Sequence, residues 1–543
     1  MRRSLLALLL LAGTSWAASP RESLLRWVPD DAGFVALATD LPRHAAAVGA
    51  SPFMELLAKK VGKELAGPKE WAKLAAAAEQ IRDALGMKTW AELADVAPGE
   101  AFAFAYRPGP VGKPEQEAGL FLLRSRDAKA LSALVAGLNK LQGAALEDAE
   151  HGGLKYVRRS EKKDKSFYLL DGATLVFSAQ EDMLKRAIDA NARRGKEAVP
   201  AVERLKSLGL EEAPLAVVAN PRAFDHLLPE SKVLRAYWGS LKAAGLGLHL
   251  DRDASLRLAF EGSTKGLPAA GRKFFEAPVR MSALWSAIPK EPLLAVAGQI
   301  DLLGLWAALG ELVPAAQREA MEKQLADLGR LTGMDLAKDA LPALGPDWGA
   351  WMAPPEGKEA MPRLAVALKA GPGTGADPVD EALLSAMQGW ATVAVANLNR
   401  KLPSEALARL VAPLDKDKLR RVESKAFPAG LVPAWGLRAG YLIAGSSPEA
   451  LAGIKDLKAE AKGAVPLARV SFKAWRKYVE ERREALAAHL MARDGLKKEQ
   501  ASARLDGVRD ALELLDRLDL TREAGEGKVA FTLRLKLAAP LRK

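Results

Sequence analysis

Residues 28–37, VPDDAGFVAL, decide the fold because they recur as residues 288–297, IPKEPLLAVA. In both copies a hydrophobic residue and a proline precede a short turn and then a run of apolar residues. An apolar run of this length, bounded by turn residues, is typical of a buried β-strand. The second copy begins 260 residues after the first, which is the size of a domain and far longer than a solenoid period.

Three further blocks recur in the same order. They are residues 86–104 and 333–351, residues 174–177 and 441–444, and residues 214–218 and 466–470. The spacing between the copies varies from block to block and is constant within each block, as expected when insertions fall in loops. We therefore predict two homologous tandem domains, with a first repeat at 18–261, a linker at 262–280 and a second repeat at 281–543.

Predicted strands outnumber predicted helices in the first repeat. The strands are expected at 33–38, 101–106, 119–124, 154–158, 166–170, 174–178, 215–219, 246–251 and 256–260. The helices are expected at 41–65, 70–85, 128–141 and 181–191, with Asp127 as the N-cap of the third. Short connections between strands favour antiparallel pairing. The expected fold class is α+β, with mostly antiparallel sheets and helices packed on a face.

Residues 1–17 have the features of a secretory signal peptide. Arg2 and Arg3 precede an apolar run at 5–12, and Ser15 and Ala17 are small residues where a signal peptidase cuts. The run is shorter than the roughly 20 residues that span a bilayer, so we predict cleavage rather than anchoring. With no other apolar segment of spanning length, we expect no transmembrane segment in the mature chain and a periplasmic or extracellular location.

The composition excludes several function classes. The chain has 543 residues, no cysteine and a formal net charge of +12. Without cysteine there are no disulfides, thiolate nucleophiles or zinc–sulfur sites. The basic residues are densest at 155–165 and 416–425, and such runs are usually solvated loops. Electrostatic binding of an anionic polymer is therefore a minor alternative, and nucleic acid is disfavoured as a partner.

No common catalytic or nucleotide-binding motif occurs in the chain, since HExxH, GxSxG, Walker and EF-hand patterns are all missing. The histidines are not at metal-ligand spacing; they are His44, His151, His226, His249 and His489. His249 alternates with leucines, which predicts a solvent-facing strand position. We assign no catalytic residue, no metal site and no cofactor.

Residues 371–375, GPGTG, follow a predicted strand and precede a predicted helix, where a glycine loop can hold a phosphate. The spacing does not fit the dinucleotide fingerprint, and Pro372 lacks the N–H that a phosphate cradle uses. We interpret the segment as a flexible loop.

Two polar positions are shared by both copies. Glu100 corresponds to Asp347, and Arg252 corresponds to Arg522. Both pairs are predicted to lie in turns, which indicates a common scaffold rather than a common active site. Several tryptophans accompany apolar segments and are predicted to pack in a core or between domains rather than to bind sugar; they are Trp27, Trp90, Trp285, Trp306, Trp348 and Trp351.

The largest difference between the copies is an enlarged helical hairpin at 475–515. Trp475 and Leu490 belong to the apolar side of its first arm, Leu505 and Leu512 belong to that of the second, and Gly495 separates the arms. Packing on its own domain is the favoured interpretation, and a projection that binds a partner is the alternative.

Residues 333–345, GMDLAKDALPALG, resemble a segment of an uncharacterised family of secreted bacterial proteins. The resemblance also covers the Val-Pro or Ile-Pro opening of each copy, whereas residues 94–98 of the first copy depart from it. It implies an exported α+β domain without an assigned activity and supplies no catalytic residue.

The function we predict is that of an exported, non-catalytic binding or structural protein of the bacterial envelope. Its ligand could be an envelope lipid, a glycan or a protein partner. One alternative is a hydrolase or transferase whose site lies between the two domains, which requires polar residues from both copies to converge.

Overall fold

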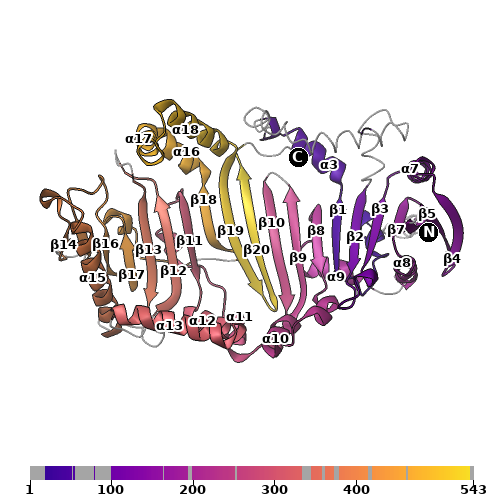
Figure 1. Cartoon of the computed structure of the whole chain (residues 1–543), viewed down its shortest axis with the longest axis horizontal. Helices are drawn as coiled ribbons and strands as arrows, with labels where there is room; N and C mark the ends of the chain where they lie inside the picture. Colours follow the sequence, from indigo (N-terminus) through magenta and orange to yellow (C-terminus); the bar gives the residue numbers. More distant parts are fainter. Residues whose placement is uncertain are drawn as a thin grey trace, which may run out of the picture.

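A computed structural model describes residues 19–51, 53–55, 79, 100–162, 164–193, 198–250, 253–332, 344–356, 361–371, 378–413, 419–459 and 463–538. These residues form an α+β fold built on one large antiparallel sheet (Figure 1). The predicted signal peptide lies outside the described residues, as do most of the predicted helices at 41–65 and 70–85 and residues 333–343 of the family-like segment.

The sheet of the described residues has twenty strands. In the first half these are β1 (Phe34–Thr39), β2 (Ala101–Arg107), β3 (Ala118–Arg124), β4 (Ala145–His151), β5 (Leu154–Glu161), β6 (Asp164–Asp171), β7 (Thr174–Ser178), β8 (Leu215–Ala219), β9 (Leu241–Leu250) and β10 (Ala254–Gly262). In the second half they are β11 (Leu294–Gln299), β12 (Leu344–Ala353), β13 (Arg363–Ala370), β14 (Arg409–Val411), β15 (Arg420–Glu423), β16 (Ala434–Arg438), β17 (Tyr441–Gly445), β18 (Val465–Ser471), β19 (Leu515–Gly525) and β20 (Lys528–Leu537).

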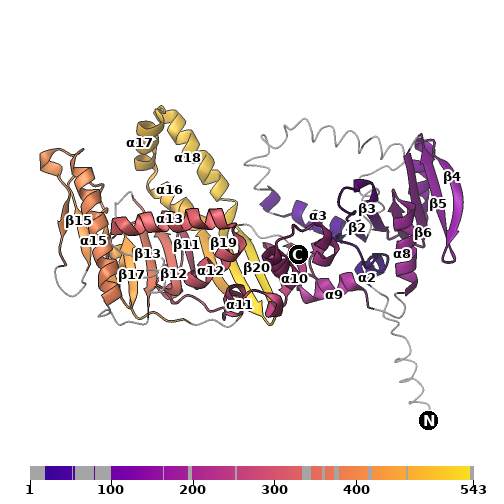
Figure 2. The same ribbon diagram turned by 60° about the horizontal axis from the view of Figure 1, so that its bottom comes forward.

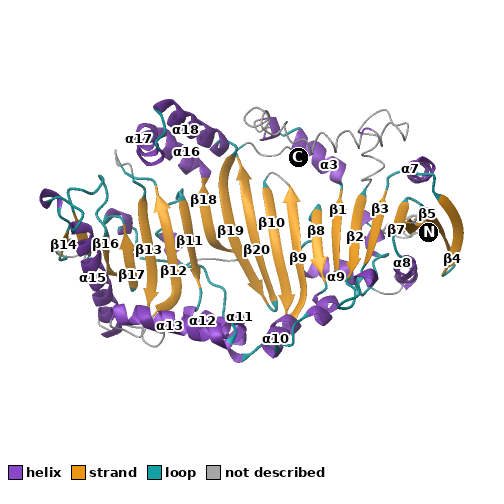
Figure 3. Cartoon of the chain, viewed as in Figure 1, coloured by secondary structure: helices purple, strands orange, loops and turns teal. Residues whose placement is uncertain are grey.

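Helices lie at both ends and along both edges of this sheet (Figure 3). The α-helices are α2 (Pro20–Leu25), α3 (Leu41–Gly49), α7 (Ala128–Leu141), α8 (Glu181–Arg193), α9 (Pro200–Ser207), α10 (Lys232–Ser240), α11 (Ala269–Glu276), α12 (Leu302–Leu312), α13 (Ala315–Thr332), α15 (Pro378–Asn399), α16 (Phe472–Glu481), α17 (Arg483–Asp494) and α18 (Lys498–Leu512). Short 3₁₀ helices include η2 (Pro221–Leu227), η3 (Thr264–Gly266), η4 (Ala283–Ser286) and η8 (Glu449–Leu451).

The strands of each half pair in the same spatial order. In the first half the order is β4, β5, β6, β7, β3, β2, β1, β8, β9 and β10. In the second half it is β14, β15, β16, β17, β13, β12, β11, β18, β19 and β20. The last strands of the two halves, β10 and β20, then pair with each other, so two expected sheets form one continuous sheet (Figure 1).

The strand sequences explain why the sheet has two different faces. In β2, AFAFAYR, the alanines Ala101, Ala103 and Ala105 are buried, whereas Phe102 and Phe104 on the other side are only partly buried. Alternate residues of a strand point to opposite faces. The small alanines allow helices to approach one face closely, and the larger aromatic rings stand on the other.

The face that carries the alanines is covered, and we call it the covered face. In the first half α2, α8 and α9 pack on it through Leu24, Leu184 and Leu205, which are nearly or fully buried. In the second half η4 and η8 take this role through Leu284 and Leu451. These two clusters form the main hydrophobic cores.

Several predicted elements are confirmed. The helix at 128–141 is α7, and the Asp127 side chain caps it by accepting hydrogen bonds from the backbone N–H of Lys129 (2.8 Å) and Ala130 (3.2 Å). The predicted strands at 101–106 and 119–124 pair as β2 and β3. By contrast, β4, α9 and α10 were not predicted, and the predicted linker at 262–280 contains η3 and α11.

The enlarged hairpin consists of three helices, because the first predicted arm breaks at Arg482 into α16 and α17. Its base packs on its own half, as favoured: Trp475 Nε1 donates to the carbonyl of Leu293 (2.9 Å), and Val479 and Leu505 join a cluster with Leu293. The helices α17 and α18 stand away from the sheet (Figure 2). No helix of the described residues is both long and apolar enough to cross a membrane.

An ionic cluster fixes the start of α8. Glu181 accepts hydrogen bonds from Tyr156 and from Arg158 (2.9 Å), and it forms an ion pair with Lys185 (3.1 Å). These contacts, led by Tyr156, lower the pKa of Glu181 to about 2.

A carboxyl group whose pKa is lowered by folding stabilises the protein above its unfolded pKa, near 4.5, and loses that contribution as the pH falls toward 2. We expect Glu181→Gln to destabilise the protein at pH 7, and we expect the difference from wild type to shrink between these two pH values. Urea unfolding at several pH values measures this difference. Glu147→Gln, at an exposed partner of Arg158, is the control and should change stability little. A Glu181→Gln effect that stays constant down to pH 2 would contradict the prediction.

Candidate binding face

The second face of the sheet carries an unbroken row of apolar residues across sixteen strands. Each member of this row is the direct cross-strand partner of the next. The row is Leu170, Leu175, Leu123, Phe102, Ala38, Leu215, Leu248, Leu256, Leu533, Leu520, Ala468, Val296, Ala350, Val366, Ala444 and Trp435. We call the side of the sheet that bears this row the apolar face.

A second row runs beside the first from β6 to β18. Its members are Tyr168, Phe177, Phe121, Phe104, Ala36, Val217, Leu246, Leu258, Phe531, Arg522 and Val465. We compared the cross-strand pairs on this face for all strands from β3 to β17. Arg522 is the one charged residue in these pairs. The rest of the surface is aliphatic, aromatic or glycine.

Much of the apolar face is accessible. Large side chains of both rows and their neighbours are exposed at Phe121 (45%), Leu215 (36%), Val217 (38%), Leu246 (38%), Leu256 (38%), Leu258 (39%), Leu533 (37%), Leu294 (40%), Leu364 (42%) and Val366 (45%). Scattered exposed leucines are normal in soluble proteins. A contiguous patch on one side of a sheet is not, and such patches mark sites that bind a ligand, a membrane or another protein.

Among the described residues, helices close the two ends of this face and leave large side chains in its middle exposed. At the first end α7 packs on it through Leu131 and Val135, which contact Tyr168. At the second end α15 packs near Trp435 through Met387 and Val395. These helices lie at opposite ends of the molecule (Figure 1), so they bound a wide apolar surface between them.

In the middle of the sheet, charged side chains lie on the covered face and leucines lie on the apolar face. There the covered face carries, beside the buried Ala259 and Ala530 of the first core, ion pairs between Arg257 and Glu523 (3.0 Å), and from Arg469 and Arg517 to Asp519 (2.8 and 2.7 Å). Because these polar groups face one side, the leucines of β9, β10 and β20 face the other. On the apolar side of the junction, Leu246, Leu256, Leu258 and Leu533 are exposed.

Aromatic rings enlarge the apolar face in the first half. Phe34 stacks on Tyr106 with ring centroids 5.1 Å apart, and Phe104 lies 4.8 Å from Phe121 in a tilted arrangement. Such pairs are worth about 0.5–1.5 kcal/mol beyond burial and keep the rings in defined positions. The rings therefore form an ordered part of the apolar face.

A cavity of about 570 Å³ lies at the end of β2, and it is the weaker candidate site. It is bordered by Arg107, Asn220, Arg222 and His226. His226 Nε2 is 2.8 Å from the carbonyl oxygen of Gly109, and Arg222 donates to the carbonyl of Leu241 (3.2 Å). These groups are engaged in fixing loops, and the cavity holds no nucleophile–base pair among its described lining residues.

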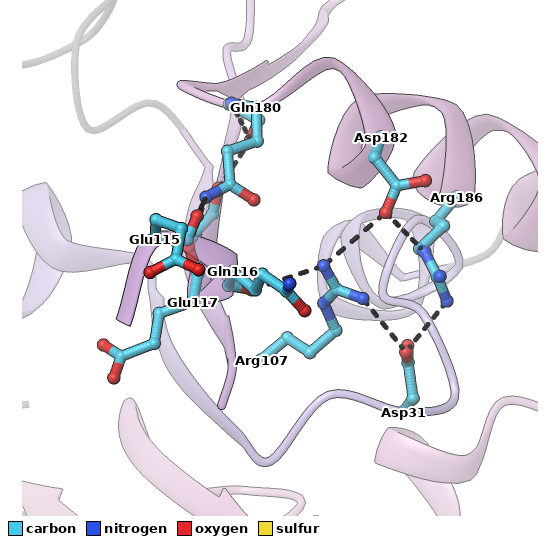
Figure 4. A network of polar contacts seen from close by, with 10 residues as sticks. Asp31, Arg107, Glu115, Gln116, Glu117, Gln180, Asp182 and Arg186 are labelled. Carbon is cyan, nitrogen blue, oxygen red and sulfur yellow. Dashed lines mark hydrogen bonds and ion pairs between the residues drawn. The ribbon is translucent and has the colours of Figure 1, made fainter. Parts of the chain in front are cut away.

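A ring of charged side chains beside this cavity also holds neighbouring segments of the chain together (Figure 4). Arg186 donates to Asp31 (3.0 Å) and to Asp182 (2.9 Å), and Arg107 lies 3.9 Å and 3.5 Å from the same two carboxylates. Gln180 reaches across to backbone carbonyls near Glu115 (Figure 4). Two arginines balance two carboxylates, so the ring joins α8 to the loop before β1 without leaving a free charge.

The structure separates the histidines. His151 pairs with Asp189 (2.8 Å), His489 is exposed on α17, and no group of acidic or histidine side chains in the described part of the chain could hold a metal. The prediction for His249 is wrong, because it lies on the covered face beside Gly247 rather than in solvent. Burial, followed by the charges of Arg257 and Arg21, lowers its pKa.

Three other polar predictions have different outcomes. Asp347 does not stabilise a turn: it is buried within β12 and accepts hydrogen bonds from Tyr441 Oη (2.7 Å) and from the backbone N–H of Ala283 (3.0 Å). Arg522 likewise lies within β19 rather than in a turn. Arg252 and residues 372–375 of the glycine loop fall outside the described residues.

The tryptophans divide between core and surface. Trp27 and Trp351 are buried in the two cores, as predicted. Trp348, three residues before Trp351, points to the apolar face instead, opposite Leu368. Its Nε1 is enclosed without a hydrogen-bond acceptor.

No protein-family model, curated protein or solved structure matches the chain.

Proposed function

We propose that the protein is an exported, non-catalytic binding protein of the bacterial envelope, and that its apolar face binds the acyl chains of a lipid. The observation that carries this proposal is the unbroken apolar row, open between α7 and α15, in both halves of the sheet. An acyl chain matches such a surface because it is long, flexible and apolar along its whole length. The energy of binding would come from removing both surfaces from water.

Internal duplication is part of the proposal. It is supported by the recurring sequence blocks and by the equal strand order of the two halves. The tripeptide Leu-Arg-Leu at residues 256–258 also recurs at residues 533–535, and its first residues, Leu256 and Leu533, are direct partners across the β10–β20 ladder. If β10 and β20 are equivalent strands of two repeats, their pairing at Leu256 and Leu533 would place two copies of one binding surface side by side.

Export remains a proposal from the sequence of residues 1–17. It agrees with the lipid proposal, because the envelope is rich in lipids that a soluble carrier must shield from water. A cysteine-free chain also needs no disulfide chemistry in that compartment.

The proposal predicts that polar side chains at the centre of the apolar face weaken lipid binding. Replacing both Leu256 and Leu533 with glutamine removes about 1 kcal/mol of apolar contact at each site, because each side chain is already half buried. We expect the full chain carrying both changes to bind dioctanoylglycerol about 30-fold more weakly than wild type. Isothermal titration calorimetry measures the two affinities.

A matched control lies one residue along the same ladder. Ser255 and Arg534 are also direct partners on β10 and β20, and they point to the opposite face. Glutamine at both positions should leave binding within about twofold of wild type. Equal losses in the two double variants, or no binding by wild type, would contradict the proposal. A stable dimer of wild type in native mass spectra without lipid would also contradict it, because a second copy would then cover the face.

A further inference from the structure

Arg522 is a charged residue in an apolar setting. Its direct partners across the sheet are Phe531 and Val465, and the residues two positions away along β19 are Leu520 and Ala524. Its Nε atom is enclosed without a hydrogen-bond acceptor. Within the described parts of the chain, no carboxylate forms an ion pair with its guanidinium group.

Two nearby arginines are paired with acids. Arg517, in the same strand, binds Asp519 (2.7 Å), and Arg257, in β10, binds Glu523 (3.0 Å), both on the other face. Burial lowers the pKa of Arg522, and no acid among the described residues raises it again. A half-buried guanidinium without a counter-ion carries a desolvation cost that an anionic ligand would offset.

We infer that Arg522 binds the phosphate of an anionic phospholipid whose acyl chains lie on the apolar face. The inference rests on the proposed function and adds the headgroup to it. A guanidinium presents a planar set of donors that matches two phosphate oxygens, so it recognises this group with defined geometry.

The position of Arg522 fits a lipid whose headgroup lies at one edge of the sheet and whose acyl chains lie across the middle of the apolar face. It lies three residues before the end of β19, near the β19–β20 turn, and that turn lies beside α10 and α11 at one edge of the sheet (Figure 1). From there the leucines of β20, β10 and β9 extend across the junction as direct partners. A phospholipid has two chains, and the apolar face spans enough strands to hold both beside each other.

The test compares two ligands that differ only in the headgroup. The full chain is titrated with dioctanoyl-phosphatidylglycerol and with dioctanoylglycerol, which lacks the phosphate. We expect wild type to bind the phospholipid about 10- to 100-fold more tightly, as for a charge-assisted hydrogen-bonded pair. Arg522→Gln should lose this preference and keep the affinity for dioctanoylglycerol. Arg534→Gln, at a neighbouring arginine on the opposite face, should keep both.

The outcomes separate the two proposals. If wild type and Arg522→Gln show the same preference for the phospholipid, Arg522 is not the headgroup site, whereas binding of dioctanoylglycerol would still support the apolar face. If decanoate binds wild type more tightly than the phospholipid and depends on Arg522, the ligand is a fatty acid and the inference is wrong. If neither glycerolipid binds wild type, the proposed function itself fails.

Discussion

Gly245→Val is expected to lower the free energy of unfolding by about 3 kcal/mol. Gly245 lies on the covered face of β9, where a Cβ atom would stand 2.6 Å from Leu210, 2.8 Å from Leu208 and 3.1 Å from the carbonyl oxygen of Val217. Leu208 and Leu210 are buried and cannot move aside without opening the core. Overpacking of this kind usually costs about 1–3 kcal/mol, and the backbone contact places this site at the upper end.

Gly298→Val is the matched control on the other face. A Cβ atom on Gly298, in β11, would meet the side chain of Leu467 at 3.5 Å, which is an ordinary contact. We expect a change of less than about 1 kcal/mol, because valine suits a strand better than glycine does. Urea unfolding of both variants gives the comparison. Equal destabilisation would contradict the difference in packing between the two glycine sites.

Asp347→Ala is the second change with a large expected effect, about 3 kcal/mol of lost stability. The side chain of Asp347 is 5% exposed, and one of its oxygens accepts both the Tyr441 hydroxyl and the backbone N–H that begins η4. Removing the carboxylate leaves two buried donors without acceptors, each at a cost of about 1–3 kcal/mol. Thermal and urea unfolding measure the loss.

Glu100→Ala is the control, because the sequence places Glu100 at the same point of the first copy. Glu100 is about a third exposed and bonds to Arg124 (3.0 Å) near the surface. A surface ion pair contributes little, so the change should cost less than about 1 kcal/mol. Similar losses in the two variants would contradict the distinction between a buried anchor in the second half and a surface contact in the first.

The local elements could be predicted because their signals are local. Asp127 precedes an amphipathic helix and caps it, and the alternation in Ala101–Arg107 is a strand pattern in any context. The recurring sequence blocks also indicated where strands recur. Prediction was weaker for β4, whose residues are mostly exposed and polar and therefore lack an apolar pattern.

The arrangement of the strands, and with it the candidate site, could not be predicted. Pairing between β10 and β20 joins residues that are far apart in sequence, and nothing in either strand specifies a partner. His249 could not be placed for the same reason. Its alternation with leucines shows that His249 and the leucines point to opposite faces of the sheet, but it does not show which of the two faces is exposed. The sequence indicated leucines inside, whereas Leu246 is exposed and His249 lies on the covered face.

Arg522 was missed because a single arginine followed by Glu523 resembles a turn or a surface ion pair. Only the register shows that Glu523 points to the opposite face, where it binds Arg257. That Arg522 has no acidic partner among the described residues follows from the register of the folded sheet and could not be read from the sequence.

Photolabelling tests most directly whether the apolar face binds lipid. A diacylglycerol with a diazirine in one acyl chain is bound to the full chain, activated by light and located by mass spectrometry of the peptides. We expect labels on outward residues of the central strands, with Leu246, Leu258 and Leu533 among them, and we expect unlabelled lipid to compete. Labels confined to the cavity near Arg107 or to the helices of the covered face would contradict the account.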